Sequence, residues 1–207
     1  MKKTLLILLS VLAVLSIGAA LYAAEKHAKT NTPVLTPVTV GVAGFHCQAC
    51  PDGLQKDLAK LPGATAVKAT LNPAQVTATL DEAKLTASEF VAAVSAHPQA
   101  MDAHKTYTGK LVLYVDAEMC KANAKMCAGC FTEIPRVLKA VKGVKQVTLD
   151  ATGKIASLTF TQGAKVTTKT LAAALAKSSY KFTVRFDQPV SAPASQSAGT
   201  GCPNCCQ

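Results

Sequence analysis

Acidic and aromatic residues are scarce in this chain of 207 residues. It contains 12 Asp and Glu, four Tyr, six Phe and no Trp. With so few carboxylates, general acid–base catalysis has little to work with. The sequence also lacks a hydrolase triad, a paired-carboxylate motif and a phosphate-binding loop. We therefore expect a binding protein and not an enzyme.

Arginine is nearly absent, although the net charge is +10. Only Arg136 and Arg185 occur among the 22 basic residues, and the lysines are scattered with no interleaved aromatic residues. Nucleic-acid binding normally needs a clustered basic stripe. The basic excess therefore indicates a solvated, lysine-rich surface, and no nucleic-acid partner is expected.

The N-terminus has the pattern of an export signal. Lys2 and Lys3 precede an apolar run from residue 5 to 15, and small residues close the segment at 21–24. This pattern predicts a signal peptide over residues 1–24, and hence a periplasmic or secreted protein with no membrane contact after cleavage. An uncleaved anchor is the alternative, since residues 5–24 approach the roughly 20 needed to span a bilayer.

Eight cysteines fall into three tight groups. Disulfides that stabilise exported proteins usually close longer loops, so this local clustering favours another use of the thiols. The groups are Cys47 and Cys50; Cys120, Cys127 and Cys130; and Cys202, Cys205 and Cys206.

The chain repeats itself at a spacing of 80 residues. Cys47-x-x-Cys50 corresponds to Cys127-x-x-Cys130 at this offset. The apolar residues that follow keep the same register, which indicates two copies of one structural unit. They are Leu54, Leu58, Leu61 and Val67 in the first copy, and Ile134, Leu138, Val141 and Val147 in the second.

Each copy predicts the order βαββαβ, with the Cys-x-x-Cys pair between the first strand and the first helix. Gly63 and Gly143 stop the first helices, and Thr86 with Glu89 forms a capping box that opens the second helix of the first copy. The last strand of the first copy is weak. The expected strands are 38–42, 66–71, 75–80 and 103–107, then 111–115, 144–149, 155–160 and 181–186, with the final helix at 168–177.

The predicted fold class is therefore α+β, with two ferredoxin-like βαββαβ sandwiches in tandem. The first domain is expected over residues 36–107 and the second over 110–187, joined by a very short linker. Residues 188–207 are rich in Pro, Ser, Ala and Gly, and predict a flexible tail that ends in cysteines.

Thiols at the start of a helix favour the thiolate form. The helix N-terminus exposes free N–H groups and carries partial positive charge, and the thiolate is both the metal ligand and the nucleophile. Two neighbouring thiolates suit a soft ion such as Cu(I), or zinc with further ligands.

The two units resemble the heavy-metal-associated domain, the small βαββαβ module of soft-metal chaperones and metal-pumping ATPases. The loops "GFHCQAC" (residues 44–50) and "KMCAGC" (residues 125–130) are similar to the Gly-Met-x-Cys-x-x-Cys pattern of that family, with Phe and Lys at the usual Met position. The resemblance implies that Cys47, Cys50, Cys127 and Cys130 bind a soft metal ion.

Cu(I) and Hg(II) are the ions favoured by this resemblance, with Zn(II) and Cd(II) as alternatives. The implied role is that of an exported chaperone, scavenger or resistance protein. A metal transporter or another metal-binding protein would be its partner.

The second loop is longer than the first by seven residues, and the insertion carries Cys120. One hypothesis makes Cys120 a third ligand beside Cys127 and Cys130. The alternative is a disulfide from Cys120 to one of them, which an oxidising compartment favours.

Other side chains are weaker candidates. By the same resemblance, Tyr180 and His97 follow the second helices and would approach the metal loops. His46 is expected to be solvated, and Met119 and Met126 offer thioether sulphurs for Cu(I) or simply fill space.

The tail cysteines Cys202, Cys205 and Cys206 form a third thiol group on a flexible segment. They would take or pass on a metal ion, because tethering raises their effective concentration, or they would form disulfides with no such role.

Two other functions compete with metal binding. A Cys-x-x-Cys at a helix start also serves thiol–disulfide oxidoreductases, although the absence of Trp and the βαββαβ order differ from the thioredoxin arrangement. The other is a structural adaptor role in a metal-efflux assembly.

Overall fold

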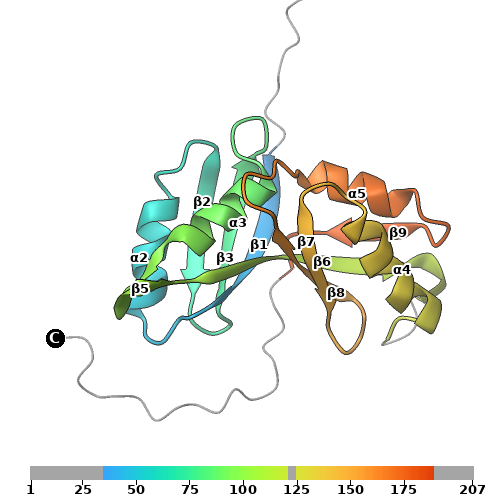
Figure 1. Cartoon of the computed structure of the whole chain (residues 1–207), viewed down its shortest axis with the longest axis horizontal. Coiled ribbons are helices and arrows are strands. Elements are labelled where there is room, and N and C mark those ends of the chain that lie inside the picture. The colour runs from blue at the N-terminus through green and yellow to red at the C-terminus, as the bar shows by residue number, and fades with distance from the viewer. Residues whose placement is uncertain (1–34, 121–124, 189–207) are drawn as a thin grey trace, which may run out of the picture. The chain divides into compact units, whose positions relative to one another are not determined.

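The computed structural model describes residues 35–120 and 125–188, in which two segments of similar element order follow one another (Figure 1). The first contains β1 (Leu35–Ala43), α2 (Ala49–Leu58), β2 (Ala64–Thr70), β3 (Gln75–Asp81), α3 (Ala87–Ala96), β4 (Pro98–Gln99) and β5 (Asp102–Thr106). The second contains β6 (Thr108–Ala117), the 3₁₀ turn η1 (Glu118–Cys120), α4 (Ala128–Lys139), β7 (Val144–Leu149), β8 (Ile155–Phe160), α5 (Thr168–Ala176) and β9 (Phe182–Arg185).

The fold is α+β with repeated βαββαβ-like units, as the sequence predicts. The predicted signal segment and all of the tail beyond Gln188 lie outside the described residues. No helix in the described part of the chain is long and apolar enough to cross a membrane.

The core follows the predicted apolar periodicity. Leu54 and Leu58 of α2 are buried, as are their counterparts Ile134 and Leu138 of α4. The capping box of α3 is present, with Thr86 and Glu89 bonding reciprocally. Along β6, alternate residues from Leu111 to Ala117 are fully buried, which is the period of a strand with one face on the core.

One strand serves both repeats. The main sheet has the order β2-β3-β1-β6-β8-β7, with β9 also paired to β6. Along one edge of β6, residues 108–112 pair with β1 and residues 114–117 pair with β9. Along the other edge, residues 111–114 pair with β8. The long strand β6 can be followed in Figure 1.

The predicted last strand of the first repeat, at 103–107, does not join the main sheet. β5 covers most of this range but pairs with β4 in a separate two-stranded sheet. The place beside β1 is taken by the first half of β6, whose apolar Leu111 and Val112 bury better than the polar β5 sequence. A polar strand gains little from the buried centre of a sheet.

The buried Ser88 and the half-buried Glu82 join the repeats further. The Ser88 hydroxyl of α3 donates to the Ala164 carbonyl at 2.7 Å and accepts from the Val166 N–H at 2.7 Å. The Glu82 carboxylate accepts from the N–H and the hydroxyl of Thr168, at 2.8 and 2.7 Å. Thr168 is the first residue of α5, so a carboxylate of the first repeat caps a helix of the second.

Candidate metal centres

The first cysteine pair lies at the start of α2, as predicted. Cys50 is in the first turn and buried, Cys47 is half-buried, and their Sγ atoms are 3.7 Å apart. Gly44 opens this loop with φ +109°, and a Cβ there would lie 2.7 Å from Nε2 of Gln99. The glycine therefore permits both the backbone turn and the close approach of the β4–β5 hairpin.

The environment of Cys50 favours the thiolate. Burial alone would raise the pKa of Cys50, but hydrogen bonds from the backbone of His46 and Cys47 and from the Tyr107 hydroxyl outweigh it and lower that pKa. This is the direction predicted for a thiol at a helix start.

Tyr107 is a functional candidate that the sequence reasoning missed. Its ring is buried, packs edge-on against Phe45 at 5.2 Å and stacks on His97 at 5.9 Å. Burial, with the hydrogen bond to Cys50, raises the pKa of Tyr107 to about 12, so the hydroxyl stays protonated and donates. The residue 80 positions later is Asp187, so the internal repeat gives no signal for this tyrosine.

His97 is not directed at the first thiol pair. Its Nε2 lies 2.9 Å from the Asp57 carboxylate, and its Nδ1 lies 2.8 Å from the Pro98 carbonyl. His46 is exposed, as predicted. Within the described ranges, no His, Asp or Glu joins Cys47 and Cys50 in a three-ligand group.

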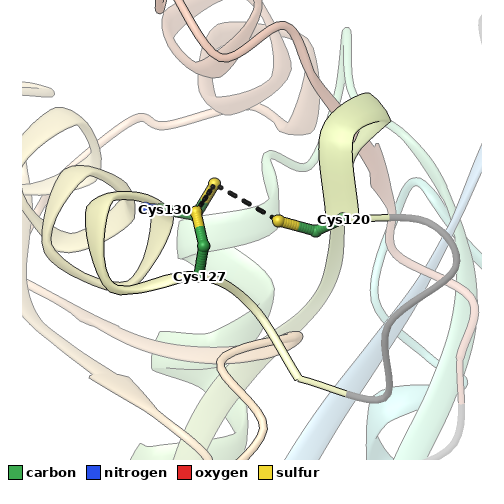
Figure 2. A group of neighbouring side chains, drawn as sticks. All are labelled: Cys120, Cys127 and Cys130. Atoms are coloured by element: carbon green, nitrogen blue, oxygen red, sulfur yellow. Dashed lines mark hydrogen bonds between the residues drawn. The ribbon is translucent and has the colours of Figure 1, made fainter.

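The second cysteine pair is joined by Cys120 (Figure 2). The Sγ atoms of Cys127 and Cys130 are 3.2 Å apart, those of Cys120 and Cys130 are 3.9 Å apart, and all three lie within 4.8 Å of one another. Cys120 ends η1, directly after β6, and its side chain points at the sulphurs of Cys127 and Cys130 at the start of α4. All three are free thiols, so the predicted alternative of a Cys120 disulfide is not formed in this structure.

The three thiols differ in exposure and acidity. Cys127 is exposed and is the N-cap of α4, where its Sγ accepts from the Cys130 N–H. That hydrogen bond, with the hydrogen bonds between Cys127 and the Cys130 and Cys120 thiols, lowers the pKa of Cys127. Burial, followed by the neighbouring Cys127 and Cys120 thiols, raises the pKa of Cys130 to about 12. The predicted preference for thiolate therefore applies to Cys127 but not to Cys130.

Tyr180 approaches the second loop, as predicted. Its hydroxyl lies 2.5 Å from the position that a Cβ would take on Gly129, between the two cysteines. The tyrosine ring stacks on Phe182 at 5.8 Å. Tyr180 also lines a hollow of about 280 Å³ together with Glu118, Ser179 and Lys181.

The β7–β8 turn holds the second loop from its other side. The Met126 N–H donates to the Thr152 carbonyl at 2.8 Å, and Gly153, with φ +74°, leaves room for Met126 and Phe131. Met126 is buried, so it packs the loop against this turn. The Met119 side chain and the tail cysteines Cys202, Cys205 and Cys206 are outside the described part of the structure.

The spacing of the sulphurs suits a thiophilic ion. Thiolates about 2.3 Å from one ion lie about 3.8 Å apart in a tetrahedral site and about 4.0 Å apart in a trigonal plane. The 3.7 Å between Cys47 and Cys50 and the 3.9 Å between Cys120 and Cys130 fit these values. The 3.2 Å between Cys127 and Cys130 needs a small opening, which the exposed Cys127 side chain can supply.

Several solved structures are similar to this chain. No protein-family model matches the chain, and no curated protein matches it. The water-soluble region of the P-type ATPase CopA from Bacillus subtilis matches with 18% identity and a TM-score of 0.34, over 72% of this chain and 89% of that one.

Two further structures are similar. The N-terminal soluble domains of Bacillus subtilis CopA match with 18% identity and a TM-score of 0.33, over 75% of this chain and 97% of that one. Oxidized MerP from Ralstonia metallidurans CH34 matches with 27% identity and a TM-score of 0.31, over 38% of this chain and 97% of that one. The structure has the repeated element order and the paired cysteines on which the predicted resemblance to tandem heavy-metal-associated domains rests.

Proposed function

We propose that the protein is an exported carrier of soft metal ions, Cu(I) or Hg(II) above all, and not an enzyme. The observation that carries the proposal is the cluster of Cys120, Cys127 and Cys130, whose free thiols lie within 4.8 Å of one another at the start of a helix. Cys47 and Cys50 repeat the arrangement with two thiols. Zn(II) and Cd(II) also accept such ligands.

The chemistry is ligand exchange. Cys127 is exposed and has a lowered pKa, so it makes the first bond to an incoming ion. The buried Cys130 then closes the chelate and releases its proton to solvent as the metal–sulphur bond forms. At the first pair, Cys47 is the more accessible thiol, and Cys50 is held by Tyr107.

The cargo would be passed by the same exchange to a second thiol-bearing protein, such as a metal transporter. The tail cysteines Cys202, Cys205 and Cys206 are further donors in this proposal. The signal pattern at residues 1–24 supports a periplasmic or secreted location. The repeats at 36–107 and 110–187 act there as two ferredoxin-like units that share strand β6.

Metal counting tests the proposal. The reduced protein is offered Cu(I), Hg(II) or Zn(II) without oxygen, and bound ions are counted by native mass spectrometry. We expect two or more soft ions on the wild-type protein, and fewer when each Cys-x-x-Cys pair is changed to serine. Wild-type protein that binds none of these ions would contradict the proposal.

A thiol–disulfide oxidoreductase is the second candidate. The exposed Cys127 with a lowered pKa, next to the buried Cys130, resembles an attacking and a resolving thiol. Insulin reduction distinguishes the two functions. The metal-carrier proposal expects no turnover above that of the Cys127→Ser variant.

A further inference from the structure

The third thiol is special to the second repeat. Cys120 ends a 3₁₀ turn that continues β6, whereas β1 ends at Ala43 and turns at once through Gly44 towards Cys47. Cys120 is 1% exposed and Cys130 is 0% exposed, so two of the three sulphurs face the interior. The cluster is thus a largely buried set of three soft donors.

The sulphurs are arranged for an ion that takes three thiolates. An ion about 2.3 Å from each sulphur, with the narrow bond angles of a pyramid, separates the sulphurs by about 3.5 Å. The observed separations of 3.2 and 3.9 Å lie on either side of this value. A linear two-thiolate ion needs about 4.6 Å between its two sulphurs. At the Cys127–Cys130 pair and at the Cys120–Cys130 pair, a pyramidal ion therefore fits with smaller movements than a linear one.

Burial selects the charge of the complex. Three thiolates leave a net charge of −2 on a monovalent ion and −1 on a divalent ion, but they neutralise a trivalent ion. An uncompensated charge is costly in a buried site. The helix N-terminus offsets only part of a negative charge, so the neutral complex is favoured at Cys120 and Cys130.

We propose that Cys120, Cys127 and Cys130 form a binding site for trivalent thiophilic ions of the arsenite class. Arsenite, As(OH)₃, would exchange its three hydroxide groups for the three thiols. Three As–O bonds break, three As–S bonds form, and each thiol proton leaves with a hydroxide as water. The arsenic stays As(III), so the step needs neither an oxidant nor a reductant.

The first repeat provides an internal comparison. Cys47 and Cys50 offer two sulphurs 3.7 Å apart, with no third ligand in the described part of the structure. They would satisfy two of the three bonding positions of arsenite and leave one hydroxide exposed to water. This inference rests on the proposed function, because it needs the thiols to be reduced, but it concerns a different ion.

The test uses two arsenicals on protein whose tail cysteines Cys202, Cys205 and Cys206 are changed to serine. Arsenite takes three thiols, whereas phenylarsine oxide takes two. We expect one arsenite per protein with three thiols consumed, and at least a tenfold loss of arsenite affinity in Cys120→Ser and in Cys120→Ala. Both variants should still bind two phenylarsine oxide molecules, one at each Cys-x-x-Cys pair, which shows that the second loop is folded and reduced.

Thr65→Ser, at an exposed position of β2, is the control and should leave arsenite binding unchanged. Arsenite binding that survives in both Cys120 variants overturns the inference, and so does a protein that binds Cu(I) but no arsenite. The second result leaves the proposed soft-metal function standing. A protein that binds neither ion overturns both.

Discussion

At the scale of single residues, the two thiol sites differ in what supports each cysteine. In the first repeat the support is the buried Tyr107 hydroxyl beside Cys50. In the second it is the N-cap position of Cys127 and the extra thiol of Cys120. The same Cys-x-x-Cys spacing therefore gives two sites with different acidity.

Tyr107→Phe tests the hydrogen bond from the Tyr107 hydroxyl to Cys50. The ring contacts with Phe45 and His97 stay, but the hydrogen bond to Cys50 is lost. We expect the pKa of Cys50 to rise and the affinity of this pair for Cu(I) to fall about tenfold, since a hydrogen bond to a charged group contributes about 1.5–3 kcal/mol. Thiolate ultraviolet absorbance against pH measures the first effect.

Tyr114→Phe is the control. Tyr114, on β6, lies under the guanidinium of Arg185, on β9, and is not among the groups that act on Cys50. An unchanged Cys50 pKa in Tyr107→Phe would show that the hydroxyl is irrelevant to the thiolate.

Gly129→Ala tests the approach of Tyr180 to the second loop. The new Cβ would meet the tyrosine hydroxyl at 2.5 Å, so we expect a loss of about 1–3 kcal/mol in the free energy of unfolding. Tyr180→Phe in the same chain should recover most of the loss. Chemical denaturation measures both.

Gly53→Ala is the matched control, because nothing lies within 4 Å of a Cβ at this position of α2. It should stabilise the protein by about 0.5–1 kcal/mol, since alanine is the better helix former. Equal effects at Gly53 and Gly129 would mean that Tyr180 does not cover the loop.

At the scale of elements, the junction between the repeats depends on a helix cap. Glu82→Ala removes both acceptors of Thr168 at the start of α5, and we expect it to cost about 1–2 kcal/mol of stability. Glu118→Ala, at an exposed position, is the control. Equal unfolding free energies for the two variants would show that Glu82 does not stabilise the start of α5.

Much of this element order is predictable from the sequence, because it follows from local patterns. The strand at 155–160 and the α3 capping box are found as predicted, since alternation and caps are read within a few residues. The pairing of β1 with β6 is not predictable in this way. It depends on whether β5 or β6 is apolar enough to lie beside β1 in the sheet.

The residues of the candidate site also fall into those that the sequence predicts and those that it does not. The cysteine pairs at helix starts follow from their spacing, and the seven-residue insertion marks Cys120 as unusual. Tyr107 and the Glu82 cap depend on contacts between segments far apart in the sequence. No local pattern encodes such contacts.

At the scale of the whole molecule, the shared strand β6 makes the first repeat depend on residues beyond 107. A fragment that ends at residue 107 keeps the β1–β3 pairing but loses β6 from the other edge of β1, whereas one that ends at residue 117 retains both. We expect the longer fragment to give dispersed amide NMR signals and the shorter one to be mostly unfolded. A well-folded shorter fragment would mean that the first repeat does not need β6.

We expect the paired cysteines of both repeats to bind a soft metal ion tightly. The most direct measurement is a competition titration of reduced protein with Cu(I) against a strong chromogenic chelator, with the tail cysteines changed to serine. The protein should remove at least two Cu(I) ions from the chelator, and serine at Cys47, Cys50, Cys127 and Cys130 should abolish this removal. A protein that leaves the chelator loaded, or a four-serine variant that competes equally well, would contradict this expectation.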